Sequence, residues 1–309
     1  MEFSSLRAAL AAGVLVLVAC GGDDTGAGAD PGGGEGGTPD AIRPGPEGGP
    51  PPDPTAGCGV SGVKTGFVGS QSLTVSGKKR TYQLYVPDVY DGKKSYPLVF
   101  VFHGDGGDGS GIRSSFQLEA ESKGGAIFVY PDGEDKTWHI DDAGSLGKDI
   151  AFVDAIGADL GTKLCTDKKR IFAVGFSKGA YFANMLGCLS KSNLRAVVAH
   201  GGGGPFGLDG SGTTFDKNGT LVCPAPPVAA MQVVGSNDDL SGDAREARDY
   251  WRRVNTCKSS TTAFAPSPCM AYDGCAQDRP EIYCEIPGMG HTIWPQNGTK
   301  VTWAFLASK

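Results

Sequence analysis

The stretch Gly175–Gly179, with the sequence Gly-Phe-Ser-Lys-Gly, constrains the fold of this chain more than any other feature. Residues 170–174 before it are mostly apolar, as in a buried strand, and residues 180–186 after it have the apolar spacing of a helix. A serine between two glycines at a sharp strand-to-helix turn is a nucleophile elbow, because the turn lifts the hydroxyl clear of the sheet. The pattern is short and the chain has 49 glycines, so a chance match is the alternative. With the strand and the helix in place, we predict that Ser177 is a nucleophile.

The first residues of the chain have the pattern of a targeting signal. Residues 6–19 form an apolar run around Arg7 that is too short to span a membrane as a helix. Small residues lead into Cys20, as in a bacterial lipoprotein signal. We therefore predict a signal peptide at 1–19 and a lipid on Cys20, which holds the protein on the outer face of the cell envelope or in the periplasm. The alternative is an ordinary secretory signal with an incidental cysteine.

Residues 20–57 are predicted to be a disordered linker. Residues 21–57 contain no aromatic side chain and only one large aliphatic one, Ile42, so they cannot bury enough apolar surface to offset the entropy of ordering. They carry seven acidic residues and one arginine, which accounts for the whole net charge of −6. The rest of the chain is formally neutral, which argues against a nucleic-acid partner and leaves the lipid as the only membrane contact.

The cysteines indicate disulfide bonds. The chain has nine cysteines, and once Cys20 is set aside an even number remains, which in an exported chain predicts disulfides and not free thiols. A zinc site is disfavoured because no Cys-x-x-Cys pair occurs and the four histidines are scattered.

Eight cysteines allow about 105 pairings. The strand after Cys165 rises to the elbow and the helix after the elbow descends to Cys188, so both cysteines are expected at the same end of the sheet. We therefore predict the pair Cys165–Cys188. Similar reasoning gives the other three pairs, which are Cys257–Cys284, Cys269–Cys275 and Cys58–Cys223.

Residues 58–309 are predicted to form one domain. Two alternating segments, 72–75 and 80–86, predict an antiparallel hairpin. The other predicted strands are 98–102, 126–130, 171–174, 196–199, 228–234 and 281–286, and two further predicted helices are 152–164 and 243–254. Such alternation predicts a mostly parallel sheet with helices on both faces, the α/β-hydrolase fold. No repeat, second globular module or attached polymer-binding domain is visible in the sequence.

Functional loops lie at the carboxyl ends of parallel strands, and three strand exits besides the elbow carry polar residues. These exits are 103–107, 235–239 and 288–295. Ser177, an aspartate from the second exit and His291 from the third follow the chain order of an α/β-hydrolase triad. Asp238 and Asp239 are both candidates for the acid.

The chemistry of a serine nucleophile assigns further roles. A serine hydroxyl needs a base, so we expect His291 to take the proton of Ser177 and return it to the leaving alcohol. The oxyanion hole is expected to use the backbone N–H of Lys178 and a second N–H from Gly104 or Asp105. No metal or organic cofactor is expected.

Other ring side chains have less specific predictions. His103 is expected to hold its loop by hydrogen bonds, and His139 and His200 are expected to pack or support loops. Trp138 and Trp294 are candidate walls of a substrate-binding site, with core packing as the alternative for each.

Several motifs stand in register across residues 58–309. They are His103-Gly104, the elbow, Gly-Ser-Asn-Asp at 235–238, Gly290-His291 followed by Trp294-Pro295, Cys165-Thr166-Asp167 and the segment 249–257. Together they resemble the esterase family of polyhydroxybutyrate depolymerases and feruloyl esterases. The spacing in that family favours Asp238 over Asp239 as the triad acid. The chain departs from the family at Lys178, Ala180 and Val234, where Asn, Gly and His are usual.

The resemblance implies a secreted serine esterase that forms an acyl-enzyme. We expect feruloyl-type esters of plant polysaccharide as substrates, because the segment 165–188 and the Gly-His-x-x-Trp-Pro ending are most similar to feruloyl esterases. Polyhydroxybutyrate depolymerase and acetyl xylan esterase are the alternatives within the family. A non-catalytic, carbohydrate-binding surface lipoprotein is the alternative from another class, and a peptidase on the same fold is a further one. We expect a monomer.

Overall fold

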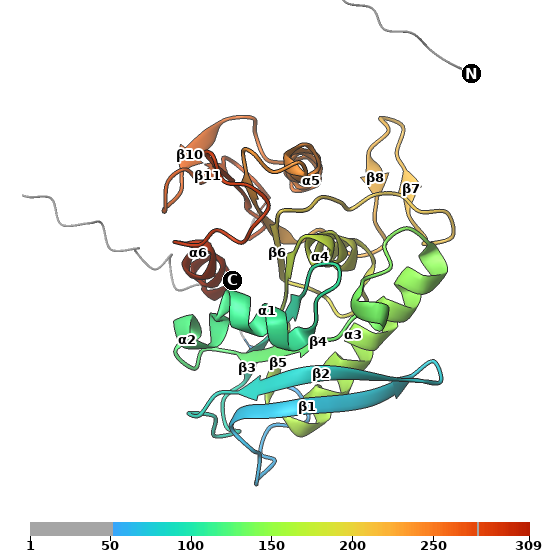
Figure 1. Cartoon of the computed structure of the whole chain (residues 1–309), viewed down its shortest axis with the longest axis vertical. Helices are drawn as coiled ribbons and strands as arrows, with labels where there is room; N and C mark the ends of the chain where they lie inside the picture. The colour runs from blue at the N-terminus through green and yellow to red at the C-terminus, as the bar shows by residue number, and fades with distance from the viewer. Residues whose placement is uncertain (1–51, 277) are drawn as a thin grey trace, which may run out of the picture. The chain divides into compact units, whose positions relative to one another are not determined.

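A mixed ten-stranded sheet organises the chain, in the order β1-β2-β4-β3-β5-β6-β9-β12-β11-β10 (Figure 1). The computed structural model describes residues 52–276 and 278–309. The predicted signal peptide, the lipid site Cys20 and the linker as far as residue 51 lie outside the described residues. The strands are β1 (Gly66–Val75), β2 (Lys78–Val86), β3 (Tyr96–Phe102), β4 (Ile127–Pro131), β5 (Thr166–Phe176), β6 (Ala196–His200), β9 (Ala229–Gly235), β10 (Thr261–Ala263), β11 (Met270–Tyr272) and β12 (Glu281–Ile286). A separate small hairpin consists of β7 (Thr214–Phe215) and β8 (Leu221–Val222).

The centre of the sheet is parallel, from β4 through β3, β5, β6 and β9 to β12. Strands β1 and β2 form the predicted antiparallel hairpin, which joins the sheet where β2 pairs with β4. Strands β10 and β11 add an antiparallel pair at the other edge, which the sequence did not predict. The mostly parallel sheet entered by an antiparallel hairpin is confirmed.

Helices cover both faces of the sheet. Along β3, Phe100 and Phe102 belong to the apolar cluster that contains α3 and α4 side chains, whereas Val99 and Val101 belong to the cluster that contains α1 and α6 side chains. Because both faces are buried, the central strands are continuously apolar instead of alternating. The helices are α1 (Gly109–Phe116), α2 (Leu118–Ser122), α3 (Ala143–Lys163), α4 (Lys178–Leu189), α5 (Ser241–Val254) and α6 (Gly298–Ala307), with a 3₁₀ turn η1 (Glu134–Lys136). None of the described helices is long and apolar enough to cross a membrane.

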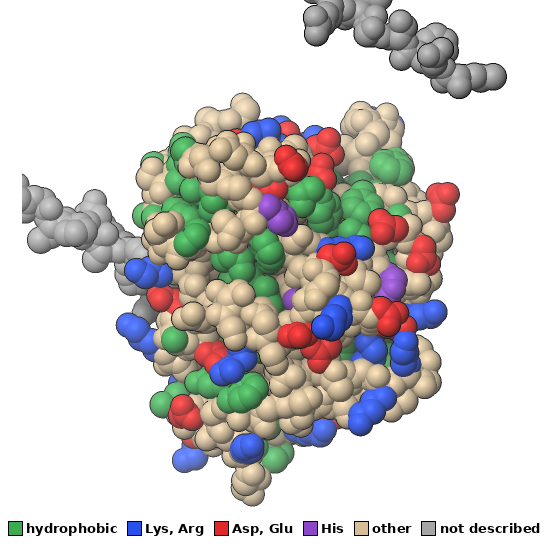
Figure 2. All heavy atoms as spheres, viewed as in Figure 1, with side chains coloured by type: hydrophobic (Ala, Val, Ile, Leu, Met, Phe, Trp, Pro, Cys, Tyr) green, Lys and Arg blue, Asp and Glu red, His purple; other side chains and the backbone are tan. Residues whose placement is uncertain are grey.

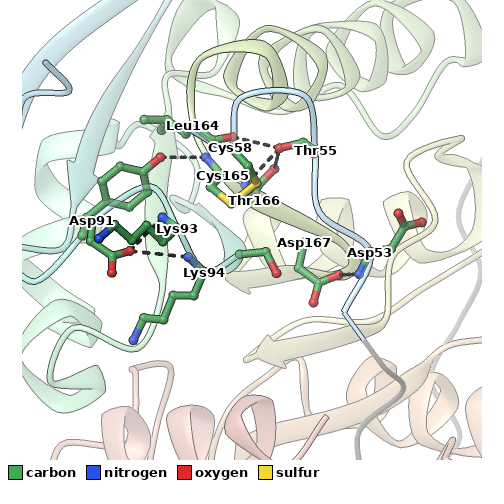
Figure 3. Close-up of a disulfide and its surroundings, with 12 residues drawn as sticks. Asp53, Thr55, Cys58, Asp91, Lys93, Lys94, Leu164, Cys165, Thr166 and Asp167 are labelled. Carbon is green, nitrogen blue, oxygen red and sulfur yellow. Dashed lines mark hydrogen bonds between the residues drawn. A yellow bond between two sulfur atoms is a disulfide. The ribbon is translucent and has the colours of Figure 1, made fainter. Parts of the chain in front are cut away.

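The chain enters the domain as a strap along the start of β5 (Figure 3). The Thr55 N–H donates to the Thr166 carbonyl at 3.0 Å, and Thr55 Oγ1 donates to the Leu164 carbonyl at 2.8 Å. These bonds satisfy polar backbone groups between the end of α3 and β5. Residues 52–57 are therefore ordered, and the predicted disordered linker ends too late at 57.

All eight described cysteines form disulfides, as predicted, but the predicted partners are wrong. The observed pairs are Cys58–Cys165, Cys188–Cys223, Cys257–Cys275 and Cys269–Cys284. The predicted pairs Cys165–Cys188, Cys257–Cys284, Cys269–Cys275 and Cys58–Cys223 are absent.

Two features of the fold explain the first two pairs. Cys165 precedes β5 and is reached by the strap, which was assigned to the disordered linker. Cys188 lies in the last turn of α4, where its carbonyl accepts a hydrogen bond from the Ala225 N–H at 3.0 Å. That contact brings Cys223 next to Cys188, so the helix end binds a loop and not the strand start.

The edge strands explain the other two pairs. In the antiparallel pairing of β11 with β12, Met270 lies opposite Tyr283. Cys269 precedes Met270 and Cys284 follows Tyr283, so in an antiparallel pair these two cysteines are also opposite each other. Their bond leaves Cys257 and Cys275 to join the end of α5 to the turn after β11. A sequence analysis that missed this edge could not find these pairs.

Glu281, the first residue of β12, is a fully buried carboxyl whose two oxygens have no hydrogen-bond partner in the described part of the chain. Burial raises the pKa of Glu281 well above its ordinary value of 4.5, while the neighbouring charges of Arg248 and Asp249 act in opposite directions. The folded state therefore holds this proton more tightly than the unfolded state. The resulting contribution to stability is complete below pH 4.5 and is lost as the pH rises through the raised pKa.

Glu281→Gln is expected to raise the melting temperature at pH 8 relative to wild type and to change it little at pH 4.5, because the amide has no proton to lose. In a domain of this size, each kcal/mol shifts the melting temperature by about 2–4 °C. Glu285→Gln is the control on the same strand: hydrogen bonds from Arg245 and Tyr283 lower the pKa of Glu285, so this change should destabilise the protein at pH 8. Thermal unfolding of the three proteins at both pH values tests this, and a lower melting temperature of Glu281→Gln at pH 8 would contradict it.

Candidate active site

The turn between β5 and α4 has the geometry of a nucleophile elbow. Ser177 has φ 55° and ψ −125°, a left-handed conformation that is strained for a residue with a side chain. A Cβ on Gly175 would lie 2.0 Å from the Gly179 carbonyl oxygen, and a Cβ on Gly179 would lie 2.4 Å from the Phe102 carbonyl oxygen. The serine itself therefore carries the strain, and the two glycines are needed because backbones approach closely.

Ser177, His291 and Asp238 are linked by hydrogen bonds. His291 Nε2 lies 2.9 Å from Ser177 Oγ, and His291 Nδ1 lies 2.8 Å from Asp238 Oδ2. The Asp238 carboxylate can only accept, so Nδ1 carries the proton and Nε2 is free to accept from the serine hydroxyl. The three side chains predicted at three separate strand exits thus meet in the order that a catalytic triad requires.

Burial distinguishes the two candidate acids. Asp238 is only 4% exposed, and its second oxygen, Oδ1, accepts the Leu240 N–H at 2.9 Å. Asp239 is exposed, and within the described residues no hydrogen bond joins it to His291. Asp238 is therefore the carboxylate that orients the histidine ring.

Neighbouring loops fix the position of His291. The carbonyl of Met289 accepts the Asn237 N–H at 3.0 Å, and a Cβ on Gly235 would lie 2.0 Å from that carbonyl oxygen. The loop that carries His291 is thus in contact with the loop that carries Asp238. The Phe176 ring stacks on the His291 ring with centroids 4.9 Å apart. Both contacts restrict the imidazole to one orientation.

The candidate oxyanion donors lie beside the elbow. A Cβ on Gly104 would be 3.2 Å from the Cβ of Ser177, so the backbone after β3 is close to this serine. The amide N–H groups of Gly104, Asp105 and Lys178 donate to no hydrogen bond within the described residues. They are available to bind a negatively charged oxygen next to Ser177.

The His103 ring forms hydrogen bonds with the backbone of this turn and of a neighbouring loop. Its Nε2 accepts the Gly133 N–H at 2.9 Å, so Nδ1 carries the proton and donates to the Gly104 carbonyl at 2.7 Å. Burial lowers the pKa of His103, which keeps the ring neutral in this arrangement. His103 has the loop-holding position that the sequence predicted.

Two side chains beside the elbow form an ion pair across the turn. Lys178 Nζ lies 3.9 Å from Asp105 Oδ1, which also accepts a hydrogen bond from Thr137 Oγ1. The Lys178 ammonium is thus engaged by a neighbouring carboxylate, at one of the positions where the chain departs from the family it resembles.

Neither predicted tryptophan forms a wall of the site. Trp138 is 0% exposed, stacks on Phe182 with ring centroids 4.6 Å apart, and donates to the His103 carbonyl at 3.0 Å. Trp294 is 5% exposed and belongs to the core cluster on the α1 and α6 side of the sheet. The prediction that they bind substrate is wrong for both, because core packing covers the rings.

The remaining histidines support other parts of the fold. His139 Nδ1 lies 3.0 Å from the buried carboxylate of Asp149. His200 is completely buried, and burial lowers its pKa to about 3. The backbone carbonyl of His200 accepts the Ser177 N–H at 2.9 Å, so the end of β6 is hydrogen-bonded to the elbow. Within the described residues, no three His, Cys, Asp or Glu side chains are grouped in a way that could hold a metal ion.

The glycine tract Gly201–Gly203 is a part of the site that the sequence analysis missed. A Cβ on Gly201 would be 3.0 Å from Asp238 Oδ2, and a Cβ on Gly202 would be 2.8 Å from the Ser177 carbonyl oxygen. Gly201 has φ 60°, which favours glycine, and a side chain at position 202 would clash with the backbone of Ser177. The signal was present in the sequence, since the tract begins two positions after the end of the predicted strand 196–199 and so stands at a strand exit.

Comparison with known proteins gives the family. The chain is 31% identical over 246 residues to a probable feruloyl esterase C of Aspergillus clavatus, and the alignment covers 74% of this chain and 83% of that protein. The chain belongs to the feruloyl esterase family. A probable feruloyl esterase C of Aspergillus terreus is 30% identical over 278 residues, covering 82% of this chain and 90% of the relative. Feruloyl esterase C of Emericella nidulans is 34% identical over 191 residues, and that alignment covers 59% of this chain and only 64% of the relative. A scan of family models found no match.

Solved structures of esterases share the fold of this feruloyl esterase family member. An acetyl xylan esterase from Aspergillus awamori has a TM-score of 0.56 at 15% identity, covering 77% of this chain and 99% of that chain. A feruloyl esterase module from Clostridium thermocellum has a TM-score of 0.54 at 13% identity, covering 83% of this chain and 92% of that chain. At such identities the likeness concerns the fold alone, and it confirms the predicted α/β-hydrolase fold.

Proposed function

We propose that this protein is a serine carboxylester hydrolase that acts through an acyl-enzyme. The observation that carries the proposal is the continuous hydrogen-bond chain from Ser177 through His291 to Asp238, with distances of 2.9 and 2.8 Å. Membership of the feruloyl esterase family supports the same activity.

The geometry leads to a two-step mechanism. Ser177 Oγ attacks the ester carbonyl carbon while His291 Nε2 takes its proton, and the Asp238 carboxylate stabilises the resulting imidazolium. His291 then gives the proton to the alcohol oxygen as the bond between that oxygen and the carbonyl carbon breaks. Water, deprotonated by His291, attacks the acyl-enzyme, and the acid leaves with Ser177 restored.

Backbone amides stabilise the negative charge that develops on the carbonyl oxygen. The Lys178 N–H and an N–H from Gly104 or Asp105 serve as the donors, because these amides are unpaired beside Ser177. Losing one such donor typically costs about 10²–10³ in rate.

The substrates are feruloyl-type esters of plant polysaccharide. Several relatives of this chain are named feruloyl esterase C, which favours aromatic acyl groups over the short hydroxyalkanoate chains of polyesters. Acetyl xylan esterase activity is the main alternative, and only the similarity of the fold supports it.

One assay compares these substrates. Methyl ferulate, acetylated xylan and a hydroxybutyrate oligomer are each incubated with wild type, and with Ser177→Ala as the blank. Release of ferulate at a kcat/KM at least about tenfold above that for the other two esters is expected. Faster release of acetate or hydroxybutyrate would overturn the feruloyl assignment while leaving the esterase intact.

The protein acts outside the cytoplasm as a lipid-anchored monomer. Four disulfides favour an oxidising compartment. The sequence pattern before Cys20 favours signal cleavage there and a lipid on that cysteine. In this organisation, residues 1–19 are removed, a linker follows Cys20, and the catalytic domain begins with the strap near residue 52.

A further inference from the structure

Tyr181 and Asp243 form a polar pair next to the triad. Tyr181 is one helical turn after the nucleophile, and its N–H donates to the Ser177 carbonyl at 3.3 Å. Its hydroxyl donates to Asp243 Oδ2 in the first turn of α5. The pair therefore joins the helix that carries Ser177 to the helix that follows Asp238.

The pair sits against the glycine tract that backs the triad. A Cβ on Gly203 would be 2.9 Å from Tyr181 Cε1 and 2.7 Å from Asp243 Cβ, so the tract fits between the two side chains. At the other end of the tract, a Cβ on Gly201 would be 3.2 Å from His291 Nδ1. Two residues of chain span at most about 7 Å. Together with the two contacts, this span places Tyr181 and Asp243 within about 16 Å of the His291 ring, which is the reach of a short oligosaccharide.

The exposed atoms of this pair have the chemistry of a sugar site. Asp243 is exposed, and its Oδ1 makes no hydrogen bond within the described residues, so it is free to accept hydroxyl protons. The Tyr181 ring is half-buried beside the Phe206 ring, with centroids 6.4 Å apart. A carboxylate next to aromatic edges offers a strong acceptor for hydroxyl groups together with an apolar surface for ring C–H groups.

The charges around the pair favour a neutral ligand. The negative charges of Asp238 and Glu246 act on Tyr181 in addition to that of Asp243. Burial and these carboxylates raise the pKa of Tyr181, which keeps its hydroxyl protonated as a donor. A uronic acid would meet like charge here, whereas a neutral pentose would not.

We propose that Tyr181 and Asp243 bind hydroxyl groups of a neutral sugar on the alcohol side of the scissile ester. This inference rests on the proposed esterase function, and it gives the enzyme a means of preferring sugar esters over simple alkyl esters. Asp243 contributes the charge-assisted acceptor, and Tyr181 fixes the orientation of its carboxylate.

Two ferulate esters test the inference, methyl ferulate and a feruloyl ester of an arabinose-bearing xylo-oligosaccharide. Asp243→Asn should lower kcat/KM about tenfold or more for the sugar ester and less than about threefold for methyl ferulate, because only the sugar ester loses a charge-assisted hydrogen bond. Asp88→Asn, which removes an exposed carboxylate after β2, is the control and should change neither value. An equal fall for both esters, or no fall for either, would overturn the inference.

A binding measurement separates this inference from the proposed function. Calorimetry with Ser177→Ala follows binding of the sugar ester without turnover. Adding Asp243→Asn should weaken that binding about tenfold or more, and Tyr181→Phe should weaken it by a smaller factor. Unchanged affinity would overturn the sugar site even if wild type is an esterase. Affinity that depends on Asp243 in a wild type that hydrolyses no ester would instead retain the sugar site and overturn the proposed function.

Discussion

Ser177→Ala should lower kcat/KM for ester hydrolysis by at least about 10⁴. The change removes the hydroxyl that is hydrogen-bonded to His291 Nε2 and leaves the backbone amides of the oxyanion hole in place. Residual hydrolysis then comes from binding and the oxyanion hole alone. Initial rates of ferulate release from methyl ferulate measure the effect.

The triad members should act as a unit. His291→Ala is expected to cost about as much as Ser177→Ala, and the double variant should be no slower than either one, since serine and histidine perform one step together. Ser114→Ala, an exposed serine on α1, is the control and should keep wild-type rates. Additive losses in the double variant would mean that the two side chains act separately.

Asp238→Asn should lower kcat by about 10⁴ while leaving KM for methyl ferulate nearly unchanged. An amide at this position can donate its N–H to His291 Nδ1, which favours the tautomer with a proton on Nε2. That tautomer cannot accept the proton of Ser177.

Asp239→Asn is the matched control for the acid. Asp239 is the next residue, is exposed, and makes no hydrogen bond with His291 within the described residues. The Asp239→Asn rate should therefore stay within about threefold of wild type. If Asp239→Asn were the slower enzyme, the geometric assignment of the acid would be wrong.

The sequence was sufficient to group Ser177, Asp238 and His291 because strand exits are local features. Each of Ser177, Asp238 and His291 lies a few residues after an apolar run long enough to be recognised as a buried strand. Parallel strands bring their carboxyl ends to one edge, so the order of the runs along the chain was enough to group the three residues. The glycine tract after β6 obeys the same rule and could have been found in the same way.

The disulfides could not be predicted because they depend on contacts between distant segments. The bond Cys58–Cys165 joins residues 107 positions apart through a strap that looks disordered by composition. The bond Cys269–Cys284 depends on the register of β11, a strand of three residues that lacks a sequence signal of its own. A prediction based on the main strands alone therefore paired the wrong cysteines.

The burial of single side chains could not be predicted from the sequence either. Trp138 and Trp294 stand near strand exits, where a substrate wall is plausible, yet both rings are packed in the two cores. Tyr181 and its neighbour Phe206, which a sequence analysis would assign to packing, remain half-exposed. Figure 2 shows hydrophobic side chains gathered in the middle of one face, with charged groups scattered around them. Exposure of this kind depends on how the loops cross over the sheet and not on residue type.

Covalent labelling tests the central claim most directly. A fluorophosphonate reacts with a serine that is activated by a histidine base, and the adduct is located by mass spectrometry of peptides. We predict one adduct per wild-type molecule, on the peptide that contains Ser177, and none on Ser177→Ala. An unlabelled wild type, or an adduct that persists in Ser177→Ala, would contradict the assignment of Ser177 as the nucleophile of a serine esterase.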